Sequence, residues 1–188
     1  MSDSRMNMQM APATKQWTLE ELHRLPDDGN KYELVRGELY VTPPPSEEHE
    51  AILTRVSMLL EPYVRAHGLG HVYAPRSVIR FDGSEVEPDR MVRRRSPSDG
   101  REWDDAPLPV LVVEVLSGST RRRDLGEKRD FYISAGVSEY WIIDPETQTV
   151  RIVRRTGEDR IVSDELVWLP QSASEPLTFR VAALFSDA

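Results

Sequence analysis

Three charged residues interrupt apolar patterns in which a charge is costly. Glu114 lies inside VLVVEVL, a run typical of a strand buried on both faces. Asp89 follows Pro88 in VEPDRMV, and because proline donates nothing to a strand ladder, the strand must bend or lie at an edge here. Lys128 falls on or beside the apolar stripe of a helix predicted after the next loop. The two carboxylates could hold a metal ion between them, with the amine as a cationic neighbour.

A carboxylate buried in a strand needs a partner for its charge, and Lys128 is the cation that the sequence offers to Glu114. We therefore expect the two side chains to face each other, with a metal ion shared between Glu114 and Asp89. A purely structural interpretation also stands, because a buried Glu–Lys pair can be a satisfied ion pair, or the lysine stem can carry its head to solvent. The occurrence of three such residues together favours a functional site over a purely structural ion pair.

The composition is that of a globular protein, with 39% hydrophobic and 30% charged residues in 188. We expect a flexible tail over residues 1–16 and a single domain over residues 17–188. No run approaches the roughly 18 apolar residues of a membrane helix, and the first residues lack the apolar core of a secretory signal. The absence of cysteine excludes disulfides and thiolate metal sites, and it is compatible with the cytoplasm.

The net charge of −8 argues against a protein that coats nucleic acid without specificity. The positive charges are nevertheless grouped, and each group flanks one of the segments described above. Solvated loop arginines and phosphate contacts are both open interpretations. The two groups are Arg93, Arg94 and Arg95, and Arg121, Arg122 and Arg123.

The hydrophobic periodicity predicts the elements that must position these residues. An N-terminal helix begins at WTLEEL, and a hairpin turns at Arg36-Gly37. After three prolines, Ser46 can cap an amphipathic helix. The elements expected next are an amphipathic helix over 46–67, strands over about 71–81, 85–92 and 109–116, a helix over about 120–135, a strand over SEYWIID, and a hairpin of TVRIVRR with RIVSDELVWL.

The order helix, three strands, helix, strand defines the predicted core. A helix between two strands implies a crossover and a parallel strand pair. We therefore expect an α/β sandwich with a mixed central sheet and an αβββαβ core. A helix and a hairpin would precede this core, and a second hairpin would follow it.

The Pro88-Asp89 pair followed by Glu114 resembles the signature of the PD-(D/E)XK nuclease superfamily, which has the restriction-endonuclease-like fold. Over a longer stretch, from about Trp17 to Arg155, the chain is similar to the bacterial Uma-type family of predicted restriction endonucleases. The segment VVEVLSGSTRRRDLGEKRDFYISAGVSEYWIIDP carries most of this resemblance. It implies a restriction-endonuclease-like sandwich and a metal-dependent endonuclease.

The chain departs from the superfamily pattern at two positions. Leu116 stands where the signature lysine belongs, and the similar family supplies its lysine from the following helix, which here is Lys128 in DLGEK. Arg90 follows Asp89 where relatives carry an apolar residue, which puts the burial of that strand end in doubt.

The resemblance implies a division of labour within the site. Asp89, Glu114 and the backbone carbonyl of Val115 would hold Mg²⁺ or Mn²⁺, which acidifies a bound water and draws charge from the phosphate. Lys128 would orient that water or offset developing negative charge. DNA is the implied substrate, the arginine groups could contact its backbone, and a homodimer is compatible with similar folds. The alternatives are a catalytically silent protein of this fold that binds nucleic acid or a partner, and a small adaptor with a structural ion pair.

Glu33 and His49 are further candidates, because an acid or imidazole near the first helix can complete such a site. Their alternatives are a cap, a hairpin surface or the core. Residues expected to have local structural roles are Asp124 at its helix start or paired with Lys128, Tyr132, Tyr140 and Trp141 in the core, and Asp144 in a turn.

Overall fold

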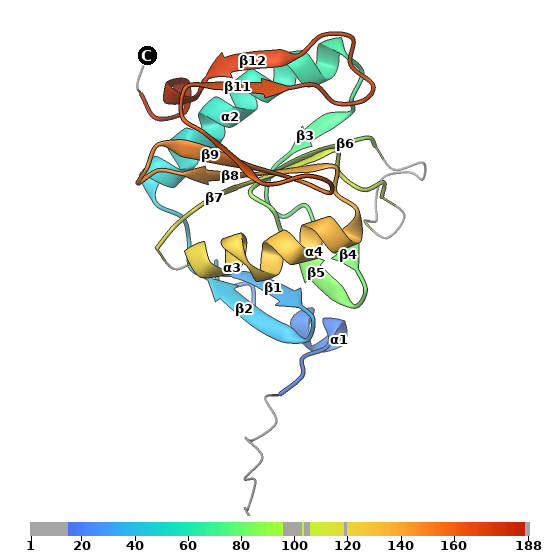
Figure 1. Cartoon of the computed structure of the whole chain (residues 1–188). Coiled ribbons are helices and arrows are strands. Elements are labelled where there is room, and N and C mark those ends of the chain that lie inside the picture. Colours follow the sequence, from blue (N-terminus) through green and yellow to red (C-terminus); the bar gives the residue numbers. More distant parts are fainter. Residues whose placement is uncertain (1–14, 96–102, 104–105, 119, 187–188) are drawn as a thin grey trace, which may run out of the picture.

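The computed structural model describes residues 15–95, 103, 106–118 and 120–186. Most of the tail predicted over residues 1–16 lies outside this part of the chain. The described residues form a mixed α/β fold in which helices pack on both sides of a six-stranded sheet (Figure 1). Within them, no helix combines the length and the apolar character needed to cross a bilayer.

The six-stranded sheet is mixed, as predicted. Its central pair, β7 and β8, is parallel, with Val113 opposite Trp141, and the other neighbours are antiparallel. This parallel pair is the one that the helical crossover required. In spatial order the strands are β10 (Arg160–Val162), β9 (Thr149–Arg154), β8 (Glu139–Asp144), β7 (Leu111–Val115), β6 (Arg90–Arg93) and β3 (His71–Tyr73).

Helix α2 (Glu47–Ala66) covers one face of this sheet (Figure 1). It begins where predicted, because the Ser46 side chain accepts a hydrogen bond from the His49 N–H. Its apolar stripe, which includes Leu53, packs with Val113 and Trp141 from the sheet in one hydrophobic core. Alternate residues of β7 therefore point to α2, and Glu114 must point to the opposite side.

The opposite face is covered by α3 (Arg121–Leu125) and α4 (Glu127–Ala135). A single helix was predicted here, and the prediction was wrong at Gly126, whose ψ of −96° is not helical. Glycine permits this break at little steric cost. The predicted end at Gly136 is confirmed by its left-handed φ of 99°.

A second sheet lies beyond α3 and α4, and two of its strands correct the prediction. The predicted strands 71–81 and 85–92 each divide between the two sheets. Each crossing contains a proline, Pro75 or Pro88, which cannot continue a ladder. The predicted turn between the two is confirmed at Asp82-Gly83, where both φ angles are positive. The strand order is β2 (Glu38–Thr42), β1 (Lys31–Val35), β5 (Ser84–Val86) and β4 (Ile79–Phe81).

Both ends of the chain add small elements. The first helix, α1 (Leu19–Leu22), is closed by a capping box between Thr18 and Glu21. The predicted C-terminal hairpin was wrong in part: β9 pairs with β10, whereas β11 (Glu165–Trp168) pairs with β12 (Leu177–Arg180), followed by the 3₁₀ helix η1 (Val181–Leu184). The alternating burial of β11 places Trp168 in the α2 core, which fixes this separate hairpin over α2.

Candidate active site

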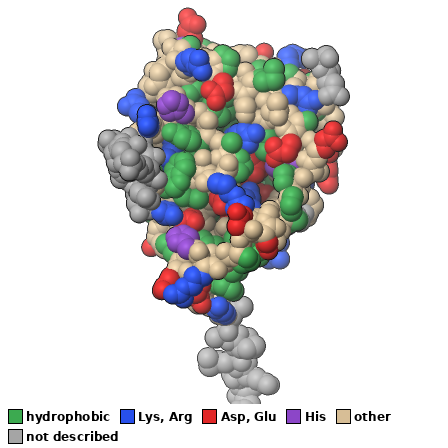
Figure 2. All heavy atoms as spheres, turned by 180° about the vertical axis from the view of Figure 1, so that it is seen from behind, with side chains coloured by type: hydrophobic (Ala, Val, Ile, Leu, Met, Phe, Trp, Pro, Cys, Tyr) green, Lys and Arg blue, Asp and Glu red, His purple; other side chains and the backbone are tan. Residues whose placement is uncertain are grey.

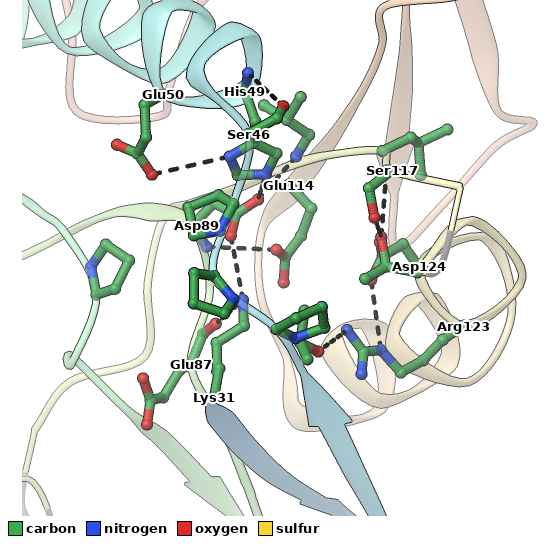
Figure 3. A pocket seen from close by; sticks show the side chains of 18 of the residues that line it. Lys31, Ser46, His49, Glu50, Glu87, Asp89, Glu114, Ser117, Arg123 and Asp124 are labelled. Atoms are coloured by element: carbon green, nitrogen blue, oxygen red, sulfur yellow. Dashed lines mark hydrogen bonds and ion pairs between the residues drawn. The ribbon is translucent and has the colours of Figure 1, made fainter. Parts of the chain in front are cut away.

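The crossing at Pro88 brings Asp89 beside Glu114. Asp89 directly precedes β6, which pairs with β7 so that Arg90 lies opposite Val113. The Asp89 N–H donates to Glu114 Oε2 over 3.3 Å, and the Val115 N–H donates to Asp89 Oδ2 over 3.0 Å. Both carboxylates line one cavity of about 280 Å³ (Figure 3). The structure thus brings together the two acids singled out in the sequence.

Lys128 is fully buried and holds Glu114 from the side away from this cavity. Its ammonium lies 2.6 Å from Glu114 Oε1 and 2.7 Å from Glu33 Oε1. The Tyr132 hydroxyl donates to the same Glu114 oxygen over 2.7 Å. The predicted Glu114–Lys128 contact is confirmed, and the lysine head does not reach solvent. Lys128 and Glu33 do not themselves line the cavity.

Two cationic side chains contact Asp89 from the open side of the site. His49, on the first turn of α2, places Nε2 3.1 Å from Asp89 Oδ2. The ammonium of Lys31, on the first residue of β1, lies 3.1 Å from Asp89 Oδ1 and 3.2 Å from the Glu87 carbonyl oxygen (Figure 3). His49 was a sequence candidate, whereas Lys31 was missed.

A signal for Lys31 was present in the sequence. Residues two apart in a strand face the same side, so a hairpin that aims Glu33 inward also aims Lys31 inward. The alternation of KYELV therefore predicts a cation next to a buried acid, once Glu33 is assigned to the interior.

Asp89 and Glu114, two of the acids that line the cavity, have opposite pKa shifts. Burial opposes the charge on Asp89, but the Lys31 ammonium and the His49 hydrogen bond outweigh it and hold the pKa of Asp89 far below its ordinary value. Burial raises the pKa of Glu114 to about 7, against the attraction of Lys128 and with the repulsion of Asp89. Asp89 is therefore the permanently charged acid, and Glu114 is the acid that can change its protonation near neutral pH.

The pKa values of the neighbouring bases and of the buried acid Glu33 are also shifted by the charges of this cluster. Burial works against the charge on Lys128 and Lys31, but neighbouring carboxylates, Glu33 and Glu114 among them, raise the pKa of both lysines. The pKa of His49 is raised in the same way, with the Asp89 hydrogen bond outweighing burial. Burial would raise the pKa of Glu33, but Lys128 and its neighbours lower it. The lysines thus remain charged although they are largely buried.

Arg123 and Asp124 extend this cluster along the wall of the cavity. Arg123 Nη2 lies 3.4 Å from Glu33 Oε2 and 3.1 Å from Thr42 Oγ1. Asp124 Oδ1 lies 3.9 Å from the Lys128 ammonium, so the predicted local i,i+4 pair exists. Three buried atoms here, Glu33 Oε2, Arg123 Nε and Asp124 Oδ1, have no hydrogen-bond partner. Each of these atoms instead lies within 4.0 Å of an oppositely charged group, so longer ion pairs hold this part of the cluster.

The six arginines of the two groups have different surroundings. Arg93 is buried, with its guanidinium 4.9 Å from the Tyr73 ring centre and 4.4 Å from that of Trp103. Arg121 pairs with Asp144 at 2.8 Å, and Arg123 is buried as described above. The exposed members are Arg94, Arg95 and Arg122.

These surroundings do not favour one continuous positive surface. On the face drawn in Figure 2, Lys and Arg side chains are scattered among Asp and Glu rather than gathered into a single patch. Phosphate contact therefore stays a prediction, and it is most readily made by the exposed arginines.

The residues expected in local roles are placed as follows. Tyr132, Tyr140 and Trp141 are buried in the core, although Tyr132 also contacts Glu114. Asp144 accepts a hydrogen bond from the Glu146 N–H in the turn after β8. Arg90, which follows Asp89, is half-buried and donates through Nε to Ser57, so the strand end beside the site remains covered.

The donor set fits a hard divalent ion in kind. Two carboxylates on one cavity are the ligands that Mg²⁺ commonly takes, with waters completing its shell. In the described part of the chain, however, no group of three or more His, Cys, Asp or Glu side chains is placed to hold a metal ion. Both Asp89 oxygens already have cationic neighbours. The backbone N–H of Val115 contacts Asp89, and the predicted role of its carbonyl stays a prediction.

Comparison with known proteins identifies a solved structure of the same fold. A solved structure from Anabaena variabilis ATCC 29413, described as that of a putative nuclease belonging to DUF820, superposes with a TM-score of 0.77. The similarity covers 90% of this chain and 97% of that one at 24% sequence identity, which shows a shared fold. Comparison with the curated proteins found no significant match.

The sequence pattern of one family matches residues 19–183, which include every element from α1 to β12 and most of η1. The matched stretch contains Asp89, Glu114 and Lys128 together with the cations around them. The chain therefore belongs to the Uma2 family, whose description is "Putative restriction endonuclease".

Proposed function

We propose that this protein is a Mg²⁺-dependent endonuclease that hydrolyses phosphodiester bonds of DNA on a restriction-endonuclease-like sandwich. Asp89 and Glu114 would hold the metal, together with the Val115 carbonyl. The observation that carries the proposal is the meeting of these two acids on one cavity, joined by the Asp89 N–H. Membership in the Uma2 family supports the same reaction class.

The side chains around Asp89 and Glu114 keep these two acids charged or hold them in position. When bound, a divalent ion would supply an acidified water and draw charge from the phosphate. Asp89 stays anionic because Lys31 and His49 depress its pKa. Lys128 fixes Glu114 through a 2.6 Å contact and is itself held by Glu33. In this conformation the Lys128 ammonium acts on Glu114, and its contact with the attacking water stays a prediction.

The substrate and setting follow from the same proposal. DNA is the substrate that the family description suggests, and the exposed Arg94, Arg95 and Arg122 would contact its phosphates. We propose the cytoplasm as the compartment, where DNA and Mg²⁺ are both present. A homodimer would place two such sites on one duplex.

The test is plasmid cleavage with Mn²⁺ or Mg²⁺. We expect the unmodified protein to convert supercoiled DNA to nicked or linear forms and Asp89→Asn to remove this activity. Asp159→Asn, an equivalent change at the Arg129 ion pair outside the cavity, is the matched control and should retain it. Circular dichroism must show that both variants are folded. Cleavage by folded Asp89→Asn at the unmodified rate would overturn the proposal.

A second candidate is a catalytically silent nuclease-fold protein that binds nucleic acid or a protein partner. It is favoured by the closed ion-pair arrangement, in which Lys31 and His49 already contact both oxygens of Asp89. This candidate predicts DNA binding that weakens steeply with salt, no cleavage with either metal, and no effect of Asp89→Asn on binding.

A further inference from the structure

Lys31 stands where a divalent ion at Asp89 would have to bind. Its ammonium contacts Asp89 Oδ1 at 3.1 Å and the Glu87 carbonyl oxygen at 3.2 Å, so it already uses two oxygens of the kind that Mg²⁺ prefers. The other Asp89 oxygen accepts the Val115 N–H and contacts His49. The cavity wall therefore presents Asp89 with one cation in place.

An ammonium and a metal ion on the same carboxylate oxygen repel each other. Mg²⁺ binds carboxylate oxygen at about 2.0–2.1 Å, so a metal on Asp89 Oδ1 would lie within about 5 Å of the Lys31 nitrogen. Lys31 is a charged group with only 18% of its side chain exposed, and little water is available to screen the repulsion. The repulsion between +2 and +1 charges is twice that between two unit charges at the same distance.

The position of Lys31 in the fold allows its ammonium to move away from Asp89. The residue begins β1, its side chain ends in a flexible four-carbon stem, and it lines the cavity rather than the closed core. Lys128 has the opposite setting: it is fully buried, does not line the cavity and contacts two acids. Lys128 is thus enclosed, whereas Lys31 lies among the side chains that line the cavity (Figure 3).

We propose that Lys31 is a built-in competitor of the divalent ion: it neutralises Asp89 in the metal-free protein and must be displaced from Asp89 when the ion binds. This inference rests on the proposed metal-dependent function. It makes Lys31 the residue that sets the metal affinity of the site. The metal would bind more weakly here than at the same two acids without the lysine.

The test is calorimetric titration of the full chain with Mn²⁺. We expect Lys31→Met to bind at least about tenfold more tightly than the unmodified protein, because the competing charge is gone. Lys15→Met is the matched control: Lys15 pairs with Glu21 outside the cavity, and its loss should leave affinity unchanged. Asp89→Asn should abolish the site in every background.

A second measurement avoids any change at position 31. The sequence contains three lysines, Lys15, Lys31 and Lys128, so NMR of ¹³Cε-labelled lysine gives few signals to follow. We expect Mg²⁺ to shift the Lys31 signal in a saturable way and to leave Lys15 unchanged, with no such shift in Asp89→Asn.

The outcomes separate this inference from the proposed function. If Mn²⁺ binds and Asp89→Asn abolishes binding, but Lys31→Met binds no more tightly and the Lys31 signal does not move, Lys31 is no competitor while the metal site stands. If neither the unmodified protein nor Lys31→Met binds Mn²⁺, the metal-dependent function itself falls, and this inference falls with it.

Discussion

Replacing Lys128 with methionine tests the energetics of the cluster most directly. The substitution keeps much of the side-chain volume and removes the one charge that lies between Glu33 and Glu114. Both acids are buried, and Glu33 Oε2 has no hydrogen-bond partner even with the lysine present. Lys128→Met therefore leaves two carboxylates facing each other in a closed interior.

The expected loss of stability follows from this geometry. Removing one partner of a buried ion pair typically costs about 3–5 kcal/mol, because the remaining charge is left uncompensated. For a chain of 188 residues each kcal/mol lowers Tm by roughly 2–4 °C, so we expect a decrease of roughly 6–20 °C. The value belongs to pH 8, above the pKa of about 7 for Glu114.

Acid should relieve part of this loss. At pH 5 Glu114 takes up a proton in the variant and no longer repels Glu33. In the unmodified protein Lys128 helps to hold the pKa of Glu33 low, and the variant lacks this attraction at either pH. The penalty of Lys128→Met should thus shrink from pH 8 to pH 5 without vanishing. Adding Glu33→Gln to Lys128→Met should recover part of the stability at pH 8, since one of the two neighbouring carboxylate charges is removed.

Urea unfolding followed by circular dichroism at both pH values measures these free energies. Lys15→Met is the control, because its partner Glu21 lies on the surface and such pairs contribute about 0–1 kcal/mol. A penalty below about 1 kcal/mol at pH 8, or one that grows on acidification, would refute the assignment of Lys128 as the counter-ion of two charged acids.

Three further predictions follow from single features. Burial raises the pKa of Glu114 to about 7 from an ordinary 4.5, so between these pH values the folded state binds one more proton than the unfolded state. The free energy of unfolding should therefore fall as pH rises from about 4.5 to 7. Urea unfolding should show that Glu114→Gln flattens this dependence. Gly136→Ala, at φ 99°, should cost about 1–2 kcal/mol by thermal unfolding, whereas Gly118→Ala, whose added Cβ meets nothing within 4 Å, should be nearly neutral. Replacing the exposed Arg94, Arg95 and Arg122 together by glutamine should reduce the magnitude of the slope of log K against log salt by up to about 3 in a DNA-binding titration. The control variant Arg129→Gln should have the slope of the unmodified protein.

Local signals in the sequence predicted local structure well. The Ser46 cap, the Asp82-Gly83 turn and the Gly136 helix end are each set by one or two residues and are found where expected. Strand partners depend on distant parts of the chain. The parallel pair of β7 and β8 was predicted, but the division of two predicted strands between two sheets was not. Pro88 was recognised as a bend, but periodicity alone cannot show that the bend carries the chain from one sheet to another.

The site could be predicted where a residue contradicted its surroundings. Glu114 and Lys128 interrupt apolar patterns, and they are in contact. Lys31 interrupts nothing, because a lysine at the start of a half-exposed hairpin strand is unremarkable until its neighbours in space are known. The sequence predicted that Lys128 orients the attacking water or offsets charge on the phosphate, but it could not show that the lysine is also the buried counter-ion of Glu33 and Glu114.

The charged side chains of the site form a row of alternating acids and bases that runs from the buried interior to the cavity. Glu33, Lys128 and Tyr132 clamp Glu114 in the interior, and the Asp89 N–H joins Glu114 to the second acid. Here the cavity side ends in Asp89 and a cation on a flexible stem. One acid is thus held by buried partners, and the other is neutralised by the lysine that, in our proposal, a metal ion displaces.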